Sequence, residues 1–184
     1  MPIRSFRFGN TRLSAVLDDD ARVALARRMA DAVVGASANR PIVVVSSAVE
    51  VARWCDEHEL LRLDDPGSLN GAADRGRDWA REHGLARIVV VHGDLPNAST
   101  LDDVADDGDA PIAVLVPDHR SDGTTVCAVP SAVPFEFSYG PGSFERHLGA
   151  ARRAGLEVRI VRDPALAFDV DVPEDLARLE SPTP

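Results

Sequence analysis

Residues 89–96 read Val-Val-Val-His-Gly-Asp-Leu-Pro, and residues 168–176 read Phe-Asp-Val-Asp-Val-Pro-Glu-Asp-Leu. In both stretches an apolar run that is typical of a buried strand ends on carboxylates and is followed by proline. Open α/β sheets bind their ligands at the carboxyl ends of their strands. The two stretches therefore predict an α/β fold with acidic side chains at its ligand-binding edge, where a metal-dependent active site would be built.

Short apolar runs alternate with amphipathic stretches along the chain, which is typical of βαβ units. This order predicts one α/β domain, residues 1–180, with a mostly parallel sheet, followed by a disordered tail, residues 181–184. The expected strands are residues 41–46, a short one near 61–63, 88–91, 112–116, 126–129 and 158–161. The expected helices are residues 18–36, 48–59, 70–83, 143–154 and a short one that begins at Pro173.

The composition limits the partners that the protein can have. The 184 residues carry 30 acidic and 20 basic side chains, a formal net charge of -10, and every Lys/Arg position is Arg. Such a balance argues against a nucleic-acid backbone as partner, since that requires a basic face. No segment approaches the ~18 apolar residues of a membrane span. Cys55 and Cys127 lack the spacing of a redox or zinc motif, so we expect them to be reduced and buried in a cytoplasmic protein.

Three aspartates are the candidate metal ligands. Asp94 follows a valine run and a glycine, and Asp169 and Asp171 are two residues apart, which places both side chains on one face of an extended segment. Converging carboxylates suit Mg²⁺ that is shared with substrate phosphates. Any one of these residues, or the nearby Asp175, could instead merely cap a helix. The pattern of three acids at two strand ends favours a metal site over that alternative.

Glycine-rich loops and N-terminal polar residues are candidate anion sites. Thr11 and Arg12 are expected in a loop before the first helix, where a nucleotide phosphate could bind. The Gly140-Pro141-Gly142 loop leads into a helix at Ser143 and could present free N–H groups to an anion. Thr124 lies in a turn that leads into the next strand. For each residue the alternative is purely structural: a surface arginine, an N-cap or a turn residue.

The sequence leaves the roles of three side chains near these candidates undecided. Arg146 and His147 could face the same anion or only solvent, and His92 is more often a packed residue than a base or ligand.

The order of these motifs resembles the guanylyltransferases of deazaflavin-coenzyme (F420) biosynthesis, within the MobA-like nucleotidyltransferase group. The resemblance covers nearly the whole chain and rests on seven short blocks. The sixth, which contains Gly-Pro-Gly-Ser-Phe, and the seventh, Asp-x-Asp-x-Pro-Glu-Asp-Leu, are quite specific in combination. The blocks are Thr11-Arg12-Leu13, Leu69-Asn70-x-Ala72, Asp94-Leu95-Pro96, Pro117-Asp118-x-Arg120, Asp122-Gly123-Thr124, Tyr139-Gly140-Pro141-Gly142-Ser143-Phe144-x-x-His147, and residues 169–176.

The resemblance implies a single-domain, three-layer αβα fold of the nucleotide-diphospho-sugar transferase type. It implies Mg²⁺-dependent transfer of a guanylyl group from GTP to 2-phospho-L-lactate or phosphoenolpyruvate, with release of pyrophosphate. The roles that it implies are metal binding and catalysis by Asp94, Asp169 and Asp171; catalysis and nucleotide binding by Arg12; nucleotide binding by Arg4, Thr11 and Asn70; and binding of the acid's carboxylate by Thr124, Gly140 and Ser143.

The sequence departs from the family pattern at four positions. Asn10 stands where the family has Lys before Thr-Arg-Leu, Arg4 stands for the Lys of the first strand, Thr125 for Asn, and His92 for Pro. The loss of Lys at position 10 removes a positive charge from the expected triphosphate site. Two alternatives therefore stay open: a nucleotidyltransferase with another donor or acceptor, and a non-catalytic homologue that binds a phosphorylated acid. A homodimer is a further open option.

Overall fold

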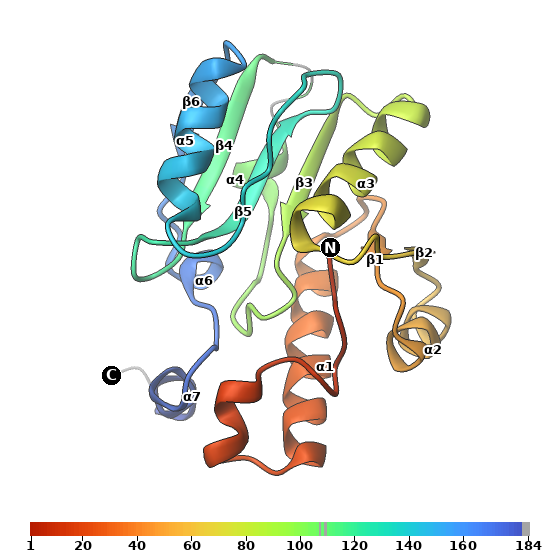
Figure 1. The fold of residues 1–184 in the computed structure, drawn as a ribbon, viewed down its shortest axis with the longest axis vertical. Coiled ribbons are helices and arrows are strands. Elements are labelled where there is room, and N and C mark those ends of the chain that lie inside the picture. Colours follow the sequence, from red (N-terminus) through yellow and green to blue (C-terminus); the bar gives the residue numbers. More distant parts are fainter. Residues whose placement is uncertain (107, 109, 182–184) are drawn as a thin grey trace.

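The structure, a computed structural model, describes residues 1–106, 108 and 110–181. Its first half contains a 3₁₀ helix and three α/β pairs, and its second half contains three more strands and four helices (Figure 1). In chain order the elements are η1 (Thr11–Ala15), α1 (Asp19–Ala36), β1 (Val43–Val45), α2 (Val49–Glu57), β2 (Leu61–Leu63), α3 (Leu69–Glu82), β3 (Arg87–Val91), α4 (Asp102–Ala105), β4 (Ile112–Pro117), β5 (Thr124–Pro130), α5 (Ser143–Arg153), β6 (Glu157–Ile160), α6 (Pro164–Ala167) and α7 (Pro173–Glu180).

The strands form two hydrogen-bonded groups, a four-stranded sheet in the order β3-β5-β4-β6 and the pair β1-β2. The ladders β1–β2 and β4–β6 are parallel, whereas β5 is antiparallel to both of its neighbours. The expected α/β class with strands mostly in one direction is confirmed. The reversal of β5 follows from the short connection from β4, residues 118–123, because a parallel crossover needs a dozen or more residues.

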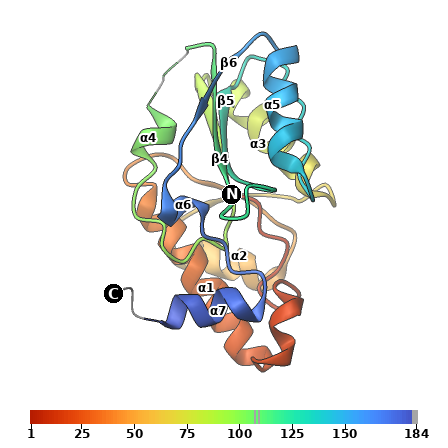
Figure 2. The ribbon, with the colours of Figure 1, turned by 90° about the vertical axis from the view of Figure 1, so that its left-hand side faces the viewer.

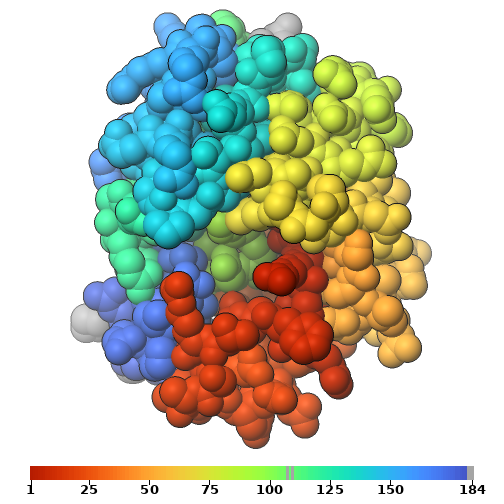
Figure 3. All heavy atoms as spheres, viewed as in Figure 1, coloured from red at the N-terminus to blue at the C-terminus, as the bar shows by residue number. Residues whose placement is uncertain are grey.

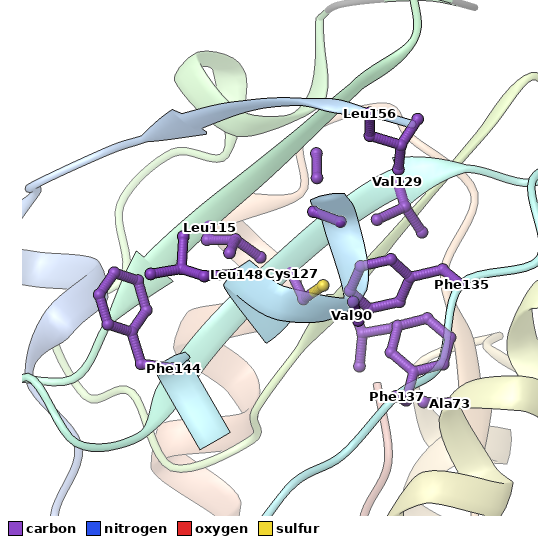
Figure 4. Packing of buried hydrophobic residues seen from close by; sticks show 13 residues of the cluster. Ala73, Val90, Leu115, Cys127, Val129, Phe135, Phe137, Phe144, Leu148 and Leu156 are labelled. Atoms are coloured by element: carbon purple, nitrogen blue, oxygen red, sulfur yellow. The ribbon is translucent and has the colours of Figure 1, made fainter. Parts of the chain in front are cut away.

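Helices cover both faces of the four-stranded sheet, which makes three layers (Figure 2). Alternate residues of each strand point to opposite faces. Val90, Leu115 and Cys127 pack with α3 and α5 in one cluster, which Figure 4 shows from close by. Their strand neighbours Val91 and Val116 pack on the other face in a second cluster, with side chains of α1 and α6. The sheet is thus buried on both faces.

The long predicted helices are confirmed to within a few residues. Helix α1 begins after Asp18, whose side chain accepts a hydrogen bond from the Ala21 backbone N–H at 2.8 Å, as expected for a cap. Cys55 and Cys127 are buried and unpaired, and burial raises the pKa of both thiols. In the described part of the chain no helix is long and apolar enough to cross a bilayer.

Two expectations about local structure were wrong. Residues 168–171 were expected to end a strand, but they belong to no ladder of the described sheets. The four-residue helix α6, capped by Asp163, takes the chain away from β6, and the segment then returns to the sheet edge through one backbone hydrogen bond, from Val170 N to Asp94 O at 3.2 Å. Thr11 and Arg12 lie in the helix η1 rather than in a loop.

Candidate active site

A cleft of about 580 Å³ opens at the carboxyl end of β3, between the N-terminal segment, the start of α3, the loop before α5 and the segment before α7. The surface is hollowed where these segments meet, as Figure 3 shows. The lining residues are Pro2, Arg12, Leu69, His92, Gly93, Asp94, Asp118, Arg120, Asp122, Gly123, Thr124, Thr125, Tyr139, Gly140, Pro141, Ser143, Asp169, Asp171 and Val172.

Most side chains that the sequence singled out meet in this cleft, although they come from segments up to 159 positions apart. The structure brings together Arg12, Asp94, Thr124, Gly140, Ser143, Asp169 and Asp171. It leaves three predicted nucleotide-binding residues, Arg4, Thr11 and Asn70, outside the lining.

Asp94 has a carboxylate oxygen that is buried inside the cleft wall. Its Oδ1 is inaccessible and has no hydrogen-bond partner among the described residues. Burial and, second, the nearby Asp171 carboxylate raise the pKa of Asp94 from 3.8 to about 7. A buried carboxylate oxygen without a partner is costly unless a proton or a cation neutralises it.

Asp169 and Asp171 face the same region, but each also has a basic neighbour. Burial, together with the charges of Asp94 and Asp171, raises the pKa of Asp169. Its Oδ1 lies 3.1 Å from His119 Nδ1. Asp171 Oδ2 lies 3.9 Å from Nη1 of Arg12, and both side chains are largely exposed. Within residues 1–106, 108 and 110–181, no group of three or more His, Cys, Asp or Glu side chains is arranged to hold a metal ion by itself.

Asp175 supports the site without lining it. The sequence suggested that it caps a helix, and the structure confirms this role. Its side chain is 1% exposed and its Oδ2 accepts hydrogen bonds from the backbone N–H groups of Asp171 and Val172. Arg120 Nη2 donates to both of its oxygens, at 2.7 and 2.9 Å. Burial opposes its ionisation, but the hydrogen bonds from Arg120 and the backbone outweigh burial and lower the pKa of Asp175. Asp175 thereby fixes the backbone that carries Asp171.

A second supporting aspartate organises the turn between β4 and β5. Asp118 accepts hydrogen bonds from the backbone N–H groups of Arg120, Asp122 and Gly123. A Cβ atom at Gly123 would lie 2.7 Å from Asp118 Oδ2, so any other residue there would displace this carboxylate. The turn signature of the sequence indicated the loop, but not which side chain holds it.

Thr124 is oriented by a buried histidine. His147 Nε2 accepts a hydrogen bond from the Ser138 backbone N–H at 2.9 Å, so its proton is on Nδ1, which lies 3.0 Å from Thr124 Oγ1. Burial, followed by the charge of Arg146 and by His92, lowers the pKa of His147 to about 4, so the ring is neutral at pH 7. Thr124 Oγ1 accepts this hydrogen bond, which leaves its hydroxyl proton available to an acceptor in the cleft.

The loop before α5 does not leave all its backbone N–H groups free for an anion, because some of them are hydrogen-bonded within the protein. Gly142 and Phe144 donate their backbone N–H groups to Asp122, to Oδ2 at 2.9 Å and to the carbonyl oxygen at 3.0 Å. Arg146 donates to backbone carbonyl groups of residues 138–141. Of the two alternatives for Arg146, solvent is confirmed, because the side chain is exposed and lies outside the lining of the cleft, while its guanidinium group also binds the carbonyl oxygens of this loop. Gly140 and Gly142 have φ of 108° and 70°, which glycine adopts readily.

His92 and Tyr139 supply two buried polar atoms to the cleft. The two rings lie 5.1 Å apart between centroids. Neither His92 Nε2 nor the Tyr139 hydroxyl has a hydrogen-bond partner among the described residues. Burial lowers the pKa of His92, so its ring is a neutral hydrogen-bond donor or acceptor rather than a cation. Tyr139 begins one of the blocks that carry the resemblance, but no role was predicted for its side chain.

The N-terminal residues contribute less to the cleft than expected. Arg4 and Thr11 are exposed outside it, and Asn70 Oδ1 accepts a hydrogen bond from the Tyr139 backbone N–H at 2.7 Å. Asn10 has φ 50° and caps η1, a left-handed conformation that asparagine tolerates better than most residues.

The charge of the lining is strongly negative. It holds five aspartates, residues 94, 118, 122, 169 and 171, against two arginines, Arg12 and Arg120. A substrate phosphate that entered this cleft alone would meet net repulsion, which a bound divalent cation would reverse.

The chain is similar in sequence to curated guanylyltransferases of three kinds. The chain is 39% identical to a phosphoenolpyruvate guanylyltransferase of Rubrobacter xylanophilus, over 98% of this chain and 92% of that protein. It is 34% identical to a 3-phospho-D-glycerate guanylyltransferase of Phenylobacterium zucineum, over 95% and 85% of the two chains. It is 28% identical to a 2-phospho-L-lactate guanylyltransferase of Methanothermobacter thermautotrophicus, over 97% and 82%.

The fold also has a counterpart among solved structures. A putative nucleotide-diphospho-sugar transferase from Desulfovibrio desulfuricans superposes with a TM-score of 0.71 at 16% identity, over 97% of this chain and 83% of that chain. The predicted fold class is therefore confirmed. The sequence profile of the family described as guanylyl transferase, CofC-like, matches residues 1–180. The chain belongs to this family of guanylyl transferases.

Proposed function

We propose that the cleft transfers a guanylyl group from GTP to the phosphate of a small phosphorylated carboxylic acid, with release of pyrophosphate. The observation that carries the proposal is the convergence of Arg12, Thr124, Ser143 and the three aspartates in one cleft. The relatives named as guanylyltransferases for phosphoenolpyruvate, 3-phospho-D-glycerate and 2-phospho-L-lactate support it.

The acceptor half is formed by the ends of β5 and α5. Thr124 points a free hydroxyl proton into the cleft, because its oxygen already accepts from His147. Ser143 is 2% exposed and lies at the first turn of α5, beside Gly140. Two hydroxyl groups at a helix N-terminus suit a carboxylate. The acceptor therefore binds with its carboxylate at Thr124 and Ser143, which directs its phosphate towards the aspartates.

Asp94, Asp169 and Asp171 would hold Mg²⁺ together with oxygens of the substrate phosphates. The unpartnered Asp94 oxygen and the mutual repulsion of the carboxylates fit a divalent cation, and substrate oxygens would complete the ligand set. A bound Mg²⁺ would neutralise the phosphates and the charge that develops in the transition state.

The side chains position the reactants, and none acts as a covalent nucleophile. One oxygen of the acceptor's phosphate attacks the α-phosphorus of GTP, the bond to the β-phosphate oxygen breaks, and pyrophosphate leaves with that electron pair. Arg12, which is 73% exposed in its side chain, is the cation free to bind the leaving phosphates. Arg120 is committed to Asp175 and supports the site instead.

A second candidate is the same chemistry with another nucleotide. It is favoured by the position of Arg4 and Thr11 outside the cleft and by Asn10 in place of a cation. The nucleotide-binding residues therefore stay a prediction, as do a place in F420 biosynthesis, a cytoplasmic location and a homodimer. A non-catalytic phospho-acid-binding homologue is the third alternative.

A matrix of substrates separates these candidates. GTP, ATP, CTP and UTP are each paired with phosphoenolpyruvate, 2-phospho-L-lactate and 3-phospho-D-glycerate, and pyrophosphate release is followed with and without Mg²⁺. The proposal expects release with GTP and one acid, lost in EDTA. Release with another nucleotide supports the second candidate, and calorimetric binding of an acid without any release supports the third.

A further inference from the structure

The side chain of His119 lies between two carboxylates next to the cleft. Its Nδ1 atom is 3.1 Å from Asp169 Oδ1, and its Nε2 atom is 3.3 Å from Asp175 Oδ1. The side chain is 17% exposed, and it occupies the unspecified position of the block that begins at Pro117, to which the resemblance gives no role. His119 therefore connects the turn between β4 and β5 with the segment that carries Asp169.

Backbone contacts and an aromatic neighbour fix the position of His119. Its backbone N–H donates to the Ala167 carbonyl oxygen at 2.7 Å. Its ring lies 5.5 Å from the ring of Phe168 between centroids. The preceding residue is Asp118, whose carboxylate holds the turn through three backbone N–H groups. The imidazole is therefore held in place by the protein itself, independently of any ligand.

Asp169 is held less firmly by its own segment. Residues 168–171 belong to no ladder of the described sheets, and the backbone link from Val170 N to Asp94 O, at 3.2 Å, ties them to the sheet edge. The negative charges of Asp94 and Asp171 also act on Asp169. Like charges repel each other, so the Asp169 side chain would turn away from the other two unless a neighbour holds it. The hydrogen bond to His119 opposes that movement.

The same hydrogen bond selects which oxygen of Asp169 remains for a ligand. An ionised carboxylate only accepts hydrogen bonds, so Nδ1 of His119 carries a proton and donates it to Oδ1. Arg120 Nη1 is 3.9 Å from this oxygen, which is beyond hydrogen-bond distance, and Arg120 Nη2 donates to Asp175. Oδ1 is thus occupied by His119, and Oδ2 is the oxygen that remains for a cation.

We propose that His119 is a positioning residue, which holds the carboxylate of Asp169 in the orientation that Mg²⁺ binding requires. This role rests on the proposed function, because it takes Asp169 as a ligand of the metal. Hydrogen-bond partners of metal ligands fix the orientation of those ligands, and their loss typically weakens metal affinity or activity about 10–100-fold. His119 does not contact the substrates in this role and acts only through Asp169.

Two substitutions separate the hydrogen bond from the packing of the ring. His119→Phe keeps an aromatic ring beside Phe168 and removes both nitrogens. His119→Asn places an amide nitrogen near the position of Nδ1, so it keeps the donor and loses the ring. The Mg²⁺ affinity of the substrate-free protein, measured by titration calorimetry, is expected to fall about 10–100-fold in His119→Phe. It is expected to stay near the wild-type value in His119→Asn.

Steady-state kinetics gives a second readout. In His119→Phe the Mg²⁺ concentration for half-maximal pyrophosphate release should rise by the same factor. Saturating Mg²⁺ should restore kcat, and KM for the acid should stay unchanged. His119→Gln has a longer side chain that directs its amide towards Asp175, so it should behave like His119→Phe and replaces that variant if it does not fold.

Two outcomes would overturn this role alone. One is wild-type Mg²⁺ affinity in His119→Phe or His119→Gln. The other is an equal loss of affinity in His119→Asn, which would make packing of the ring the cause. A wild type that binds no Mg²⁺ and releases no pyrophosphate with any substrate pair would refute the proposed function, and this role with it.

Discussion

His147 determines which way the Thr124 hydroxyl points, through the 3.0 Å contact between its Nδ1 and Thr124 Oγ1. If that hydroxyl binds the acceptor's carboxylate, Thr124→Val removes one hydrogen bond to a charged group, worth about 1.5–3 kcal/mol. We expect KM for the acid to rise about 10–100-fold with KM for the nucleotide unchanged. Thr124→Ser keeps the hydroxyl and serves as the control. An unchanged KM for the acid in Thr124→Val would place the carboxylate elsewhere.

The pH dependence of stability tests the neutral state of His147. Its pKa is lowered from 6.5 to about 4 in the folded protein. The contribution of the neutral ring to the free energy of unfolding is therefore complete above pH 6.5 and is lost as the pH falls towards 4. The loss amounts to about 3 kcal/mol. Urea unfolding from pH 7 to pH 4 should therefore show a steeper decline in the wild type than in His147→Gln, which cannot titrate. Parallel declines would mean that folding does not shift the pKa of His147, which would contradict its burial as a neutral ring.

The pKa of Asp94 is shifted in the opposite direction, so its effect on the pH dependence of stability has the opposite sign. Its pKa is raised from 3.8 to about 7, so the stability that its protonated form provides is lost as the pH rises through 7. Without divalent cations at pH 8, Asp94→Asn should be more stable than the wild type by about 2 kcal/mol. Saturating Mg²⁺ should raise Tm of the wild type but not of the variant. Thermal unfolding with Mg²⁺ and with EDTA measures both, and a Tm of the wild type that ignores Mg²⁺ would argue against these ligands.

Substitutions at two glycines distinguish a specific effect on the turn between β4 and β5 from a general effect on stability. At Gly123 an added Cβ meets Asp118 Oδ2 at 2.7 Å, so Gly123→Ala should displace that carboxylate and cost about 1–3 kcal/mol along with acceptor binding. At Gly35, inside α1, an added Cβ meets nothing within 4 Å, so Gly35→Ala should gain about 0.5–1 kcal/mol. Chemical denaturation and acid titration of both variants check this, and equal effects would refute the role given to Gly123.

The sequence predicted elements well wherever the signal was local. Asp18 caps α1 and apolar residues recur along it, so its start was found within one residue. The valine run of β3 followed by Gly93 correctly placed Asp94 at a strand end. In contrast, an apolar pattern carries no direction, so the antiparallel course of β5 was missed, although the short connection between the two predicted strands indicates it.

The side-chain partners of the supporting residues were missed because a sequence pattern does not show which segments meet. His147 is fixed by the Ser138 backbone, and Asp175 pairs with Arg120, 55 positions earlier. Alternation of apolar and acidic residues looks the same in a strand and in an extended loop, so residues 168–171 were assigned to a strand. The strand-end and loop patterns had already singled out the seven residues that meet in the cleft, and the resemblance gave each of them a specific role.

The most direct test of the central claim is ³¹P NMR of the protein with GTP, phosphoenolpyruvate and Mg²⁺, followed over time. Transfer predicts free pyrophosphate and, in equal amount, a new pair of coupled signals from a diphosphate that joins the guanylyl group to the acid. Asp94→Asn should give neither. Spectra that stay those of the two substrates with every phosphorylated acid tried, or that show only GDP and phosphate, would contradict guanylyl transfer at this cleft.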